Sequence, residues 1–158
     1  MWQRIQTVFL ALTAILMLLV VFLPIWEKSS PEGEYLVISA IQMQHIKDNI
    51  EVAGHNQPTA YLAVLAVLAA LVSIYNILSY KKRLLQIKLA ALSNLLITLF
   101  VGVTFYWIYT ADAWFSPPAH GDYLAGAYLP LLALLCNMLA IRGIKKDEAL
   151  VRSMDRLR

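Results

Sequence analysis

The residues able to carry out covalent or redox chemistry are few in this sequence. There is a single cysteine, Cys136, and it lies within an apolar run. An enzyme that exchanges electrons between thiols and quinones needs two cysteines, because a disulfide must form and break in each cycle. No Gly-x-Ser-x-Gly nucleophile turn and no phosphate-binding loop occurs. The sequence therefore predicts no catalytic residue and no cofactor.

The histidines are the next candidates, because imidazole binds metals and transfers protons near neutral pH. The three histidines and their possible acidic companions are His45, His55, His120, Glu51, Asp112 and Asp122. A divalent metal site needs three or four converging ligands, and the spacing offers no tight ligand pair. We interpret the histidines as solvated side chains and predict no metal site.

The sequence is strongly apolar, since 60% of its 158 residues are hydrophobic and only 15% are charged. Four stretches contain no charged side chain and no histidine. They are Ile5 to Trp26, Thr59 to Tyr80, Leu89 to Tyr109 and Tyr123 to Ile141. Each approaches or exceeds the roughly 20 residues that a helix needs to cross a bilayer. Proton-coupled transporters and ion pumps place an ionisable group in the apolar core, so coupled transport is not predicted.

These runs predict an all-α membrane protein, a bundle of four transmembrane helices forming a single membrane domain. The spans are expected at about residues 5–26, 59–80, 84–109 and 123–142, with an outer loop at 27–58 and a tail at 143–158. The first run is longer than the apolar part of a signal peptide and lacks an Ala-x-Ala-like cleavage site, so we interpret it as a retained anchor.

Polar uncharged residues inside the spans are the remaining candidates for a site. Asn76, Asn94 and Asn137 lie at similar depth in the predicted cytoplasmic half of the bundle. By helical rise, each is about 6–9 Å from the end of its span marked by Tyr80, Lys88 or Arg142. One hypothesis makes them a polar pocket for a lipid headgroup or small ligand. The other makes them interhelical hydrogen bonds, each contributing about 0.6 kcal/mol, and we favour the second.

The distribution of basic residues predicts the orientation in the membrane. Of the 13 Lys and Arg residues, 11 lie in the N-terminus, the second loop and the tail, and only Lys28 and Lys47 lie in the first and third loops. Positively charged segments stay on the cytoplasmic side, so both termini are expected inside, in a bacterial inner membrane. The basic balance then reflects topology and lipid contact, and no nucleic-acid binding is expected.

The first outer loop is long enough to form structure of its own. Residues 35–42 alternate in side-chain type and are rich in β-branched residues, which favours a strand. Asp48 and Asn49 would then turn the chain into a short returning strand over Ile50 to Ala53. A competing interpretation is an interfacial helix with Ile38, Ile41, His45 and Ile46 on one face. We favour a small β-hairpin resting on the outer ends of the helices.

The tail is dense in charge and patterned as an amphipathic helix. Leu150, Met154 and Leu157 follow helical spacing, and we expect a new helix to begin after Gly143 beneath the cytoplasmic leaflet. The predicted partner or lipid contacts are Arg142, Lys145, Lys146, Leu150, Arg152, Met154, Arg156, Leu157 and Arg158. Acidic residues among the bases weaken pure lipid binding, so docking on a protein, or on the protein's own bundle, is also expected.

Three segments carry a resemblance to a known family: "MWQRIQ" leading to "FLPIW", "YKKRLLQIKL" after the second span, and "YLPLLALLCNMLAIRGIKKDEALVRSMDRLR" at the end. They resemble a family of small four-span inner-membrane proteins of Bacteroidota that carries only a domain-of-unknown-function label. The resemblance implies architecture and location, and it implies no activity.

Together these features lead us to expect a non-enzymatic accessory subunit or scaffold. It would bind membrane lipids and a larger membrane-associated assembly through its tail and outer loop. The alternative is an enzyme or carrier that binds lipid or a small molecule at the level of the three asparagines. A junction or adhesion protein would share the layout, but the missing loop cysteines argue against it.

Overall fold

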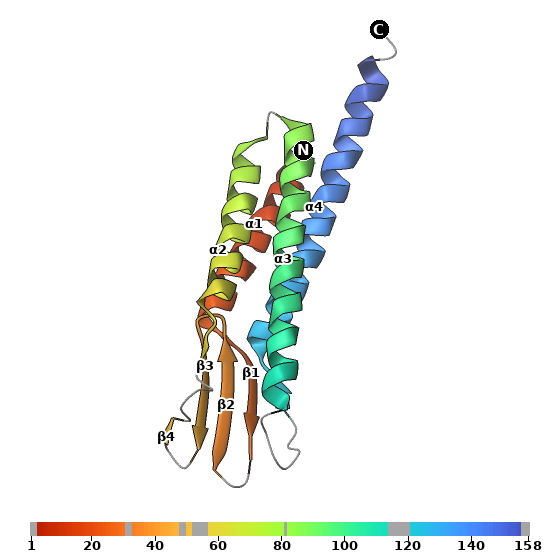
Figure 1. Cartoon of the computed structure of the whole chain (residues 1–158). Coiled ribbons are helices and arrows are strands. Elements are labelled where there is room, and N and C mark those ends of the chain that lie inside the picture. Colours follow the sequence, from red (N-terminus) through yellow and green to blue (C-terminus); the bar gives the residue numbers. More distant parts are fainter. Residues whose placement is uncertain are drawn as a thin grey trace.

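The structure is a computed structural model of the chain, and it describes residues 3–30, 33–47, 50–51, 57–80, 82–113 and 121–155. Long helices make up most of it, and a small antiparallel sheet lies at one end of the bundle (Figure 1). At the other end the first helix begins and the last helix projects beyond the bundle. We call these two ends the sheet end and the terminal end.

The helices are α1 (Gln3–Phe22), α2 (Ala60–Leu78), α3 (Arg83–Asp112) and α4 (Ala125–Asp155). Each packs against two neighbours, because α1 contacts α2 and α4, and α3 also contacts α2 and α4. All four are long and apolar enough to span a membrane. Small residues on α2, namely Ala66, Ala69 and Ala70, are buried and let the helices approach closely.

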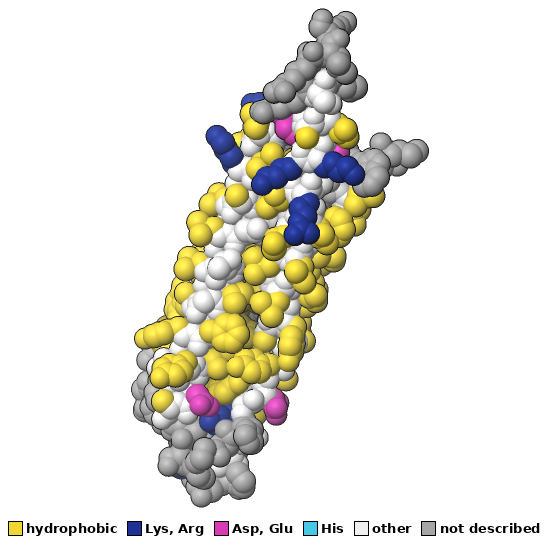
Figure 2. All heavy atoms as spheres, turned by 90° about the vertical axis from the view of Figure 1, so that its right-hand side faces the viewer, with side chains coloured by type: hydrophobic (Ala, Val, Ile, Leu, Met, Phe, Trp, Pro, Cys, Tyr) yellow, Lys and Arg dark blue, Asp and Glu magenta, His cyan; other side chains and the backbone are white. Residues whose placement is uncertain are grey.

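The outer surface of the bundle is apolar. Only 28–33% of the residues in each span are buried within the protein, and many large hydrophobic side chains point outward. Figure 2 shows this surface as a hydrophobic band between basic side chains near the terminal end and a few charged side chains near the sheet end. An apolar surface of this extent suits a lipid environment, and the four helices could cross a membrane by their length and composition.

The sheet contains the strands β1 (Pro24–Ser29), β2 (Glu34–Ser39), β3 (Gln42–Lys47), β4 (Ile50–Glu51), β5 (Gln57–Pro58) and β6 (Gly121–Tyr123). Their order is β4-β3-β2-β1-β6, with β5 also pairing with β3, and every pairing is antiparallel. Gly33 adopts a positive φ of 82° in the turn before β2, a conformation that glycine permits at little cost.

A second hydrophobic cluster joins this sheet to α3. Trp26, Leu36 and Ile38 are almost fully buried and pack with Ile108 and Ala111 near the end of α3. The sheet is therefore fastened to the bundle by its own apolar face. A strand forms as expected over Glu34–Ser39, but the chain bends at Ala40 and Ile41, and Gln42 begins the next strand. The competing interfacial helix is wrong, because residues 42–47 also form a strand and the buried face takes alternate residues.

The sheet is larger than the expected hairpin. The apolar run that begins the chain leaves the helix at Phe22 and continues as β1, because Pro24 cannot extend the helical hydrogen bonds and Ile25 and Trp26 face the protein interior. β6, from the third loop, pairs with β1 and was not predicted. Of the expected returning strand, Ile50 and Glu51 pair with β3, while Val52 and Ala53 lie outside the described residues.

The tail also differs from the expectation of a separate helix after Gly143. α4 runs without interruption to Asp155. Gly143 faces α1, and a Cβ there would lie 2.8 Å from Cγ of Gln6. The buried face continues through it from Ala140 to Ile144. Gly143 therefore allows close packing of two helices and does not start a new one.

Candidate functional site

The three intramembrane asparagines take part in two separate interhelical contacts. Nδ2 of Asn137 on α4 donates to Oδ1 of Asn94 on α3 at 2.8 Å, and also to the Ala90 carbonyl oxygen at 2.8 Å. Asn137 is fully buried. This pair fastens α3 to α4.

Asn76 makes its contacts elsewhere, between α2 and α3. Nδ2 of Asn76 donates to the backbone carbonyl oxygen of Gln86 at 3.1 Å. In return, Nε2 of Gln86 donates to the backbone carbonyl oxygen of Asn76 at 3.1 Å. Ser73 and Ser93 join the same two helices through their hydroxyl groups at 2.9 Å. The structure thus brings Asn94 and Asn137 together and places Asn76 in a different interface.

Two buried amide oxygens, Oδ1 of Asn76 and Oδ1 of Asn137, accept no hydrogen bond from the described residues. A buried acceptor without a donor is a site where a water or a ligand group would be stabilised. One pocket is lined by Tyr80 and Gln86, which lie near Asn76 in the sequence, but by none of the three asparagines.

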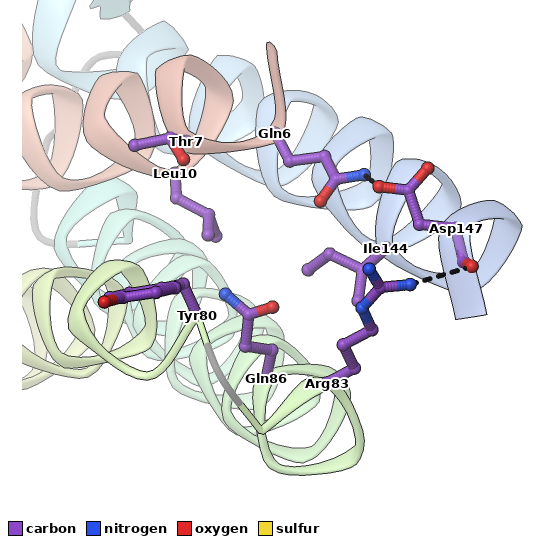
Figure 3. Close-up of a pocket in the computed structure, with 8 residues that line it drawn as sticks. All are labelled: Gln6, Thr7, Leu10, Tyr80, Arg83, Gln86, Ile144 and Asp147. Atoms are coloured by element: carbon purple, nitrogen blue, oxygen red, sulfur yellow. Dashed lines mark hydrogen bonds between the residues drawn. The ribbon is translucent and has the colours of Figure 1, made fainter. Parts of the chain in front are cut away.

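That pocket opens at the terminal end of the bundle, where α1, α3, α4 and the turn after α2 contribute to it (Figure 3). It is lined by Gln6, Thr7, Leu10, Tyr80, Arg83, Gln86, Ile144 and Asp147. Its volume is about 40 Å³, which is room for about three water molecules at roughly 10–15 Å³ each. The pocket can hold water or one small polar group, and it is too small for a lipid headgroup with its glycerol.

Asp147 is the residue on which the other helices converge here. Nε2 of Gln6 on α1 donates to its carboxylate at 2.7 Å, and a guanidinium nitrogen of Arg83 on α3 donates to its backbone carbonyl at 2.9 Å (Figure 3). These two contacts clamp α4 against the first turns of α1 and α3. Asp147 therefore marks the level at which the bundle ends.

Beyond this clamp α4 extends past the ends of the other described helices. Residues 148–155 add eight helical residues, which extend about 12 Å past Asp147 at 1.5 Å per residue. Figure 1 shows this projection rising above the ends of the other helices. Leu150 on it is 56% exposed, although leucine is apolar.

The predicted tail contacts are only partly described. Arg142, Lys145 and Lys146 are exposed near the clamp, and Leu150 is exposed on the projection. The side chains of Arg152 and Met154, and the whole of Arg156, Leu157 and Arg158, lie outside the described residues.

The expectation that the histidines are solvated is wrong for His45. His45 lies on β3 and is only 4% exposed, because the sheet covers it. His55 and His120 lie outside the described residues. Within the described part of the chain, no three or more His, Cys, Asp or Glu side chains gather as a metal site would require.

Ion pairs stabilise the sheet end. Lys28 on β1 is buried, and its Nζ lies 2.5 Å from a carboxylate oxygen of Asp112, the last residue of α3. Lys47 pairs with Glu34 across β2 and β3, and its hydrogen bond holds the pKa of the Glu34 carboxyl below its usual value. Burial raises the pKa of Tyr35 beside them, and the carboxylate of Glu27 adds to the effect.

Sequence reasoning missed the clamp at Asp147. Gln6 and Asp147 were assigned no role from the sequence, and Arg83 was counted only among the basic residues of the second loop. A signal was present, since Gln6, Arg83 and Asp147 are polar residues at span ends, where side chains at one depth can meet. Which of them face inward depends on helix rotation, and the charge count does not contain that information.

These features define the class: a bundle of four apolar helices that could span a membrane, with a small sheet at one end and a single helix projecting from the other. The chain belongs to the family described as domain of unknown function (DUF4293), whose profile matches residues 2–157. The comparison with curated proteins finds no match.

Proposed function

We propose that this protein is a non-enzymatic accessory subunit or scaffold that binds a larger membrane-associated assembly through the projecting end of α4. The observation that carries the proposal is the continuation of α4 past Asp147, as a helix that extends beyond the ends of the other three described helices (Figure 1). An exposed apolar residue such as Leu150, with Lys145 exposed below it, suits a partner that offers an apolar groove with an acidic edge.

The clamp supports this function because it gives the projection a rigid base. A helix that leaves the bundle at a point held by both Gln6 and Arg83 presents its surface in a fixed direction. Preformed geometry lowers the ordering entropy lost on binding.

We place the protein in a bacterial inner membrane with both termini in the cytoplasm, on the strength of the basic residues at the terminal end. A cysteine introduced at Ser153 should then resist a membrane-impermeant thiol reagent in intact cells, and one at Ser29, which is exposed on β1, should react, both in a Cys136→Ala background. Labelling of the Ser153 position alone would reverse the orientation and remove the cytoplasmic partner from the proposal.

The partner is tested by photo-crosslinking within cells. A benzophenone amino acid at Leu150 samples the projection, and the same group at Leu135 is the matched control. These two leucines lie on one helix and are 56% and 58% exposed. We expect a discrete protein adduct from position 150 and only lipid adducts from position 135.

A truncation after Asp147 completes the test, since it removes the projection and keeps the clamp. The truncated protein should reach the membrane in normal amount and lose the companion that co-purifies with the full chain. Recovery of the full chain alone from mild detergent, with no adduct at position 150, would refute the accessory role.

The alternative function is an enzyme or carrier that binds lipid or a small molecule at the asparagine level. The observation that favours it is the pair of buried oxygens, Oδ1 of Asn76 and Oδ1 of Asn137, that accept no hydrogen bond from the described residues. Against it, the amide groups bond mainly to other helices. Ligand density beside these asparagines in an experimental map would favour the alternative.

A further inference from the structure

A second pocket lies at the sheet end, on the side where α3 meets β1 and β6. It is lined by Trp26, Phe105, Ile108, Tyr109, Asp112, Gly121 and Tyr123. Its volume is about 330 Å³, about eight times that of the terminal-end pocket. Four of the seven lining residues are aromatic, and one is a carboxylate.

The wall on the α3 side is a single face of that helix. Phe105, Ile108, Tyr109 and Asp112 follow the spacing i, i+3, i+4, i+7, so their side chains lie above one another over the last two turns. Tyr109 is 81% exposed and Phe105 is 51% exposed, which leaves both rings accessible at the rim.

The sheet supplies the other wall. Trp26 on β1 and Tyr123 on β6 are directly paired in the sheet, and the ring of Tyr123 lies 6.3 Å from that of Phe105 at an angle of 54°. Gly121 is required at its position, because a Cβ there would come within 2.2 Å of the Trp26 indole. The glycine lets the buried indole lie against the strand and contribute to the pocket lining.

Asp112 places a negative charge at one end of this aromatic pocket. Its side chain is 58% exposed, whereas that of Lys28 is 2% exposed. Nζ of Lys28 lies 2.5 Å from Oδ1 of Asp112. The accessible side of the ion pair is therefore the acidic one.

We propose that this pocket binds the ammonium group of a phospholipid headgroup. Aromatic faces attract ammonium groups, and a carboxylate beside them accepts their hydrogen bonds. The pocket adjoins the end of an apolar span, the depth at which headgroups lie. An aromatic belt alone accounts for exposed rings, but it does not account for their convergence with Asp112 around one cavity.

The proposal predicts preference for ethanolamine lipids over glycerol lipids, and it does not depend on the partner proposed for α4. The purified full chain is equilibrated with vesicles containing equal amounts of phosphatidylethanolamine and phosphatidylglycerol, and native mass spectrometry measures the ratio of the two lipids retained. Tyr109→Ala should lower that ratio about fivefold, the factor expected for loss of one exposed cation–π contact.

The matched control is Tyr106→Ala, because Tyr106 is also an exposed aromatic residue of α3, at 64%, and does not line this pocket. Asp112→Asn tests the carboxylate, with Asp122→Asn on β6 as its exposed control. Both controls should retain the preference. Asp112→Asn also removes the carboxylate that contacts the buried Lys28. If Asp112→Asn does not fold for this reason, the result of Tyr109→Ala decides whether the pocket binds the lipid.

Equal retention of the two lipids by the unaltered protein would overturn the proposal. So would an equal effect of Tyr106→Ala and Tyr109→Ala, which indicates a general belt effect. Soluble phosphoethanolamine is added as a separate arm. Displacement of the lipid by it at micromolar concentration would show that a free small molecule, and not a membrane lipid, is the ligand.

Discussion

Substitution of Asn94 and Asn137 tests the interpretation of the intramembrane asparagines as structural contacts. Asn137→Ala removes two hydrogen bonds, to Oδ1 of Asn94 and to the carbonyl of Ala90, whereas Asn94→Ala removes only the first. Interhelical hydrogen bonds in membrane proteins contribute about 0.6 kcal/mol on average. Loss of bonding should therefore lower the free energy of unfolding by about 1.2 kcal/mol for Asn137→Ala and about 0.6 kcal/mol for Asn94→Ala.

The double substitution removes no further bond once Asn137 has been replaced. The two single effects should therefore exceed the double effect by about 0.6 kcal/mol, the worth of the shared bond. The cost of the small cavities left by alanine largely cancels in this comparison. Unfolding is measured by steric trapping in bicelles, which keeps the helices in a lipid environment.

Asn76→Ala combined with Asn137→Ala is the control, because these residues bond to different partners in different helix interfaces. Their effects should add within about 0.5 kcal/mol. Absence of coupling between positions 94 and 137 would contradict the hydrogen bond on which the reasoning depends. A stabilising effect of Asn137→Ala would indicate that the polar group is retained for a ligand.

Two further predictions concern the sheet end. Gly121→Ala should destabilise the protein by about 1–3 kcal/mol, because the added Cβ would overlap the indole of Trp26, which is only 2% exposed. The readouts are a shift in tryptophan fluorescence and a lower melting temperature. An unchanged melting temperature would contradict the close contact. The hydrogen bond to Lys47 lowers the pKa of Glu34, so this pair stabilises the fold above the ordinary pKa of about 4.5, and the stabilisation is lost as the pH falls through the lower pKa of the folded state. The difference in melting temperature between the wild type and Glu34→Gln should therefore shrink below pH 4.5. A difference that does not change with pH would contradict the assignment.

Much of the architecture could be predicted because it depends on properties of single segments. A run such as Thr59 to Tyr80 has no charge over the length of a bilayer span, whichever helix it packs against, and α2 lies within it. The alternation of residues 35–42 likewise predicted a strand, which a sheet with one buried face requires.

The candidate sites were less predictable, because they depend on pairs of residues distant in the sequence. Asn94 and Asn137 were expected at one depth, and depth follows from helical rise alone. That Asn137 meets Asn94 while Asn76 meets Gln86 depends on how each helix is rotated about its axis. The pocket beside Trp26 exists only because β6 pairs with β1 and brings Gly121 to the indole.

The amino-acid sequence by itself determined that this chain forms four apolar helices with a strand-forming segment between the first two, since hydrophobic length and side-chain periodicity act locally. The tertiary structure alone decided that α4 continues through Gly143. It also decided that Asp147 is held by Gln6 and Arg83, and that an aromatic pocket closes around Asp112. The physical reason is that a glycine can end a helix or permit close packing with equal ease, and only the neighbouring helix selects between them.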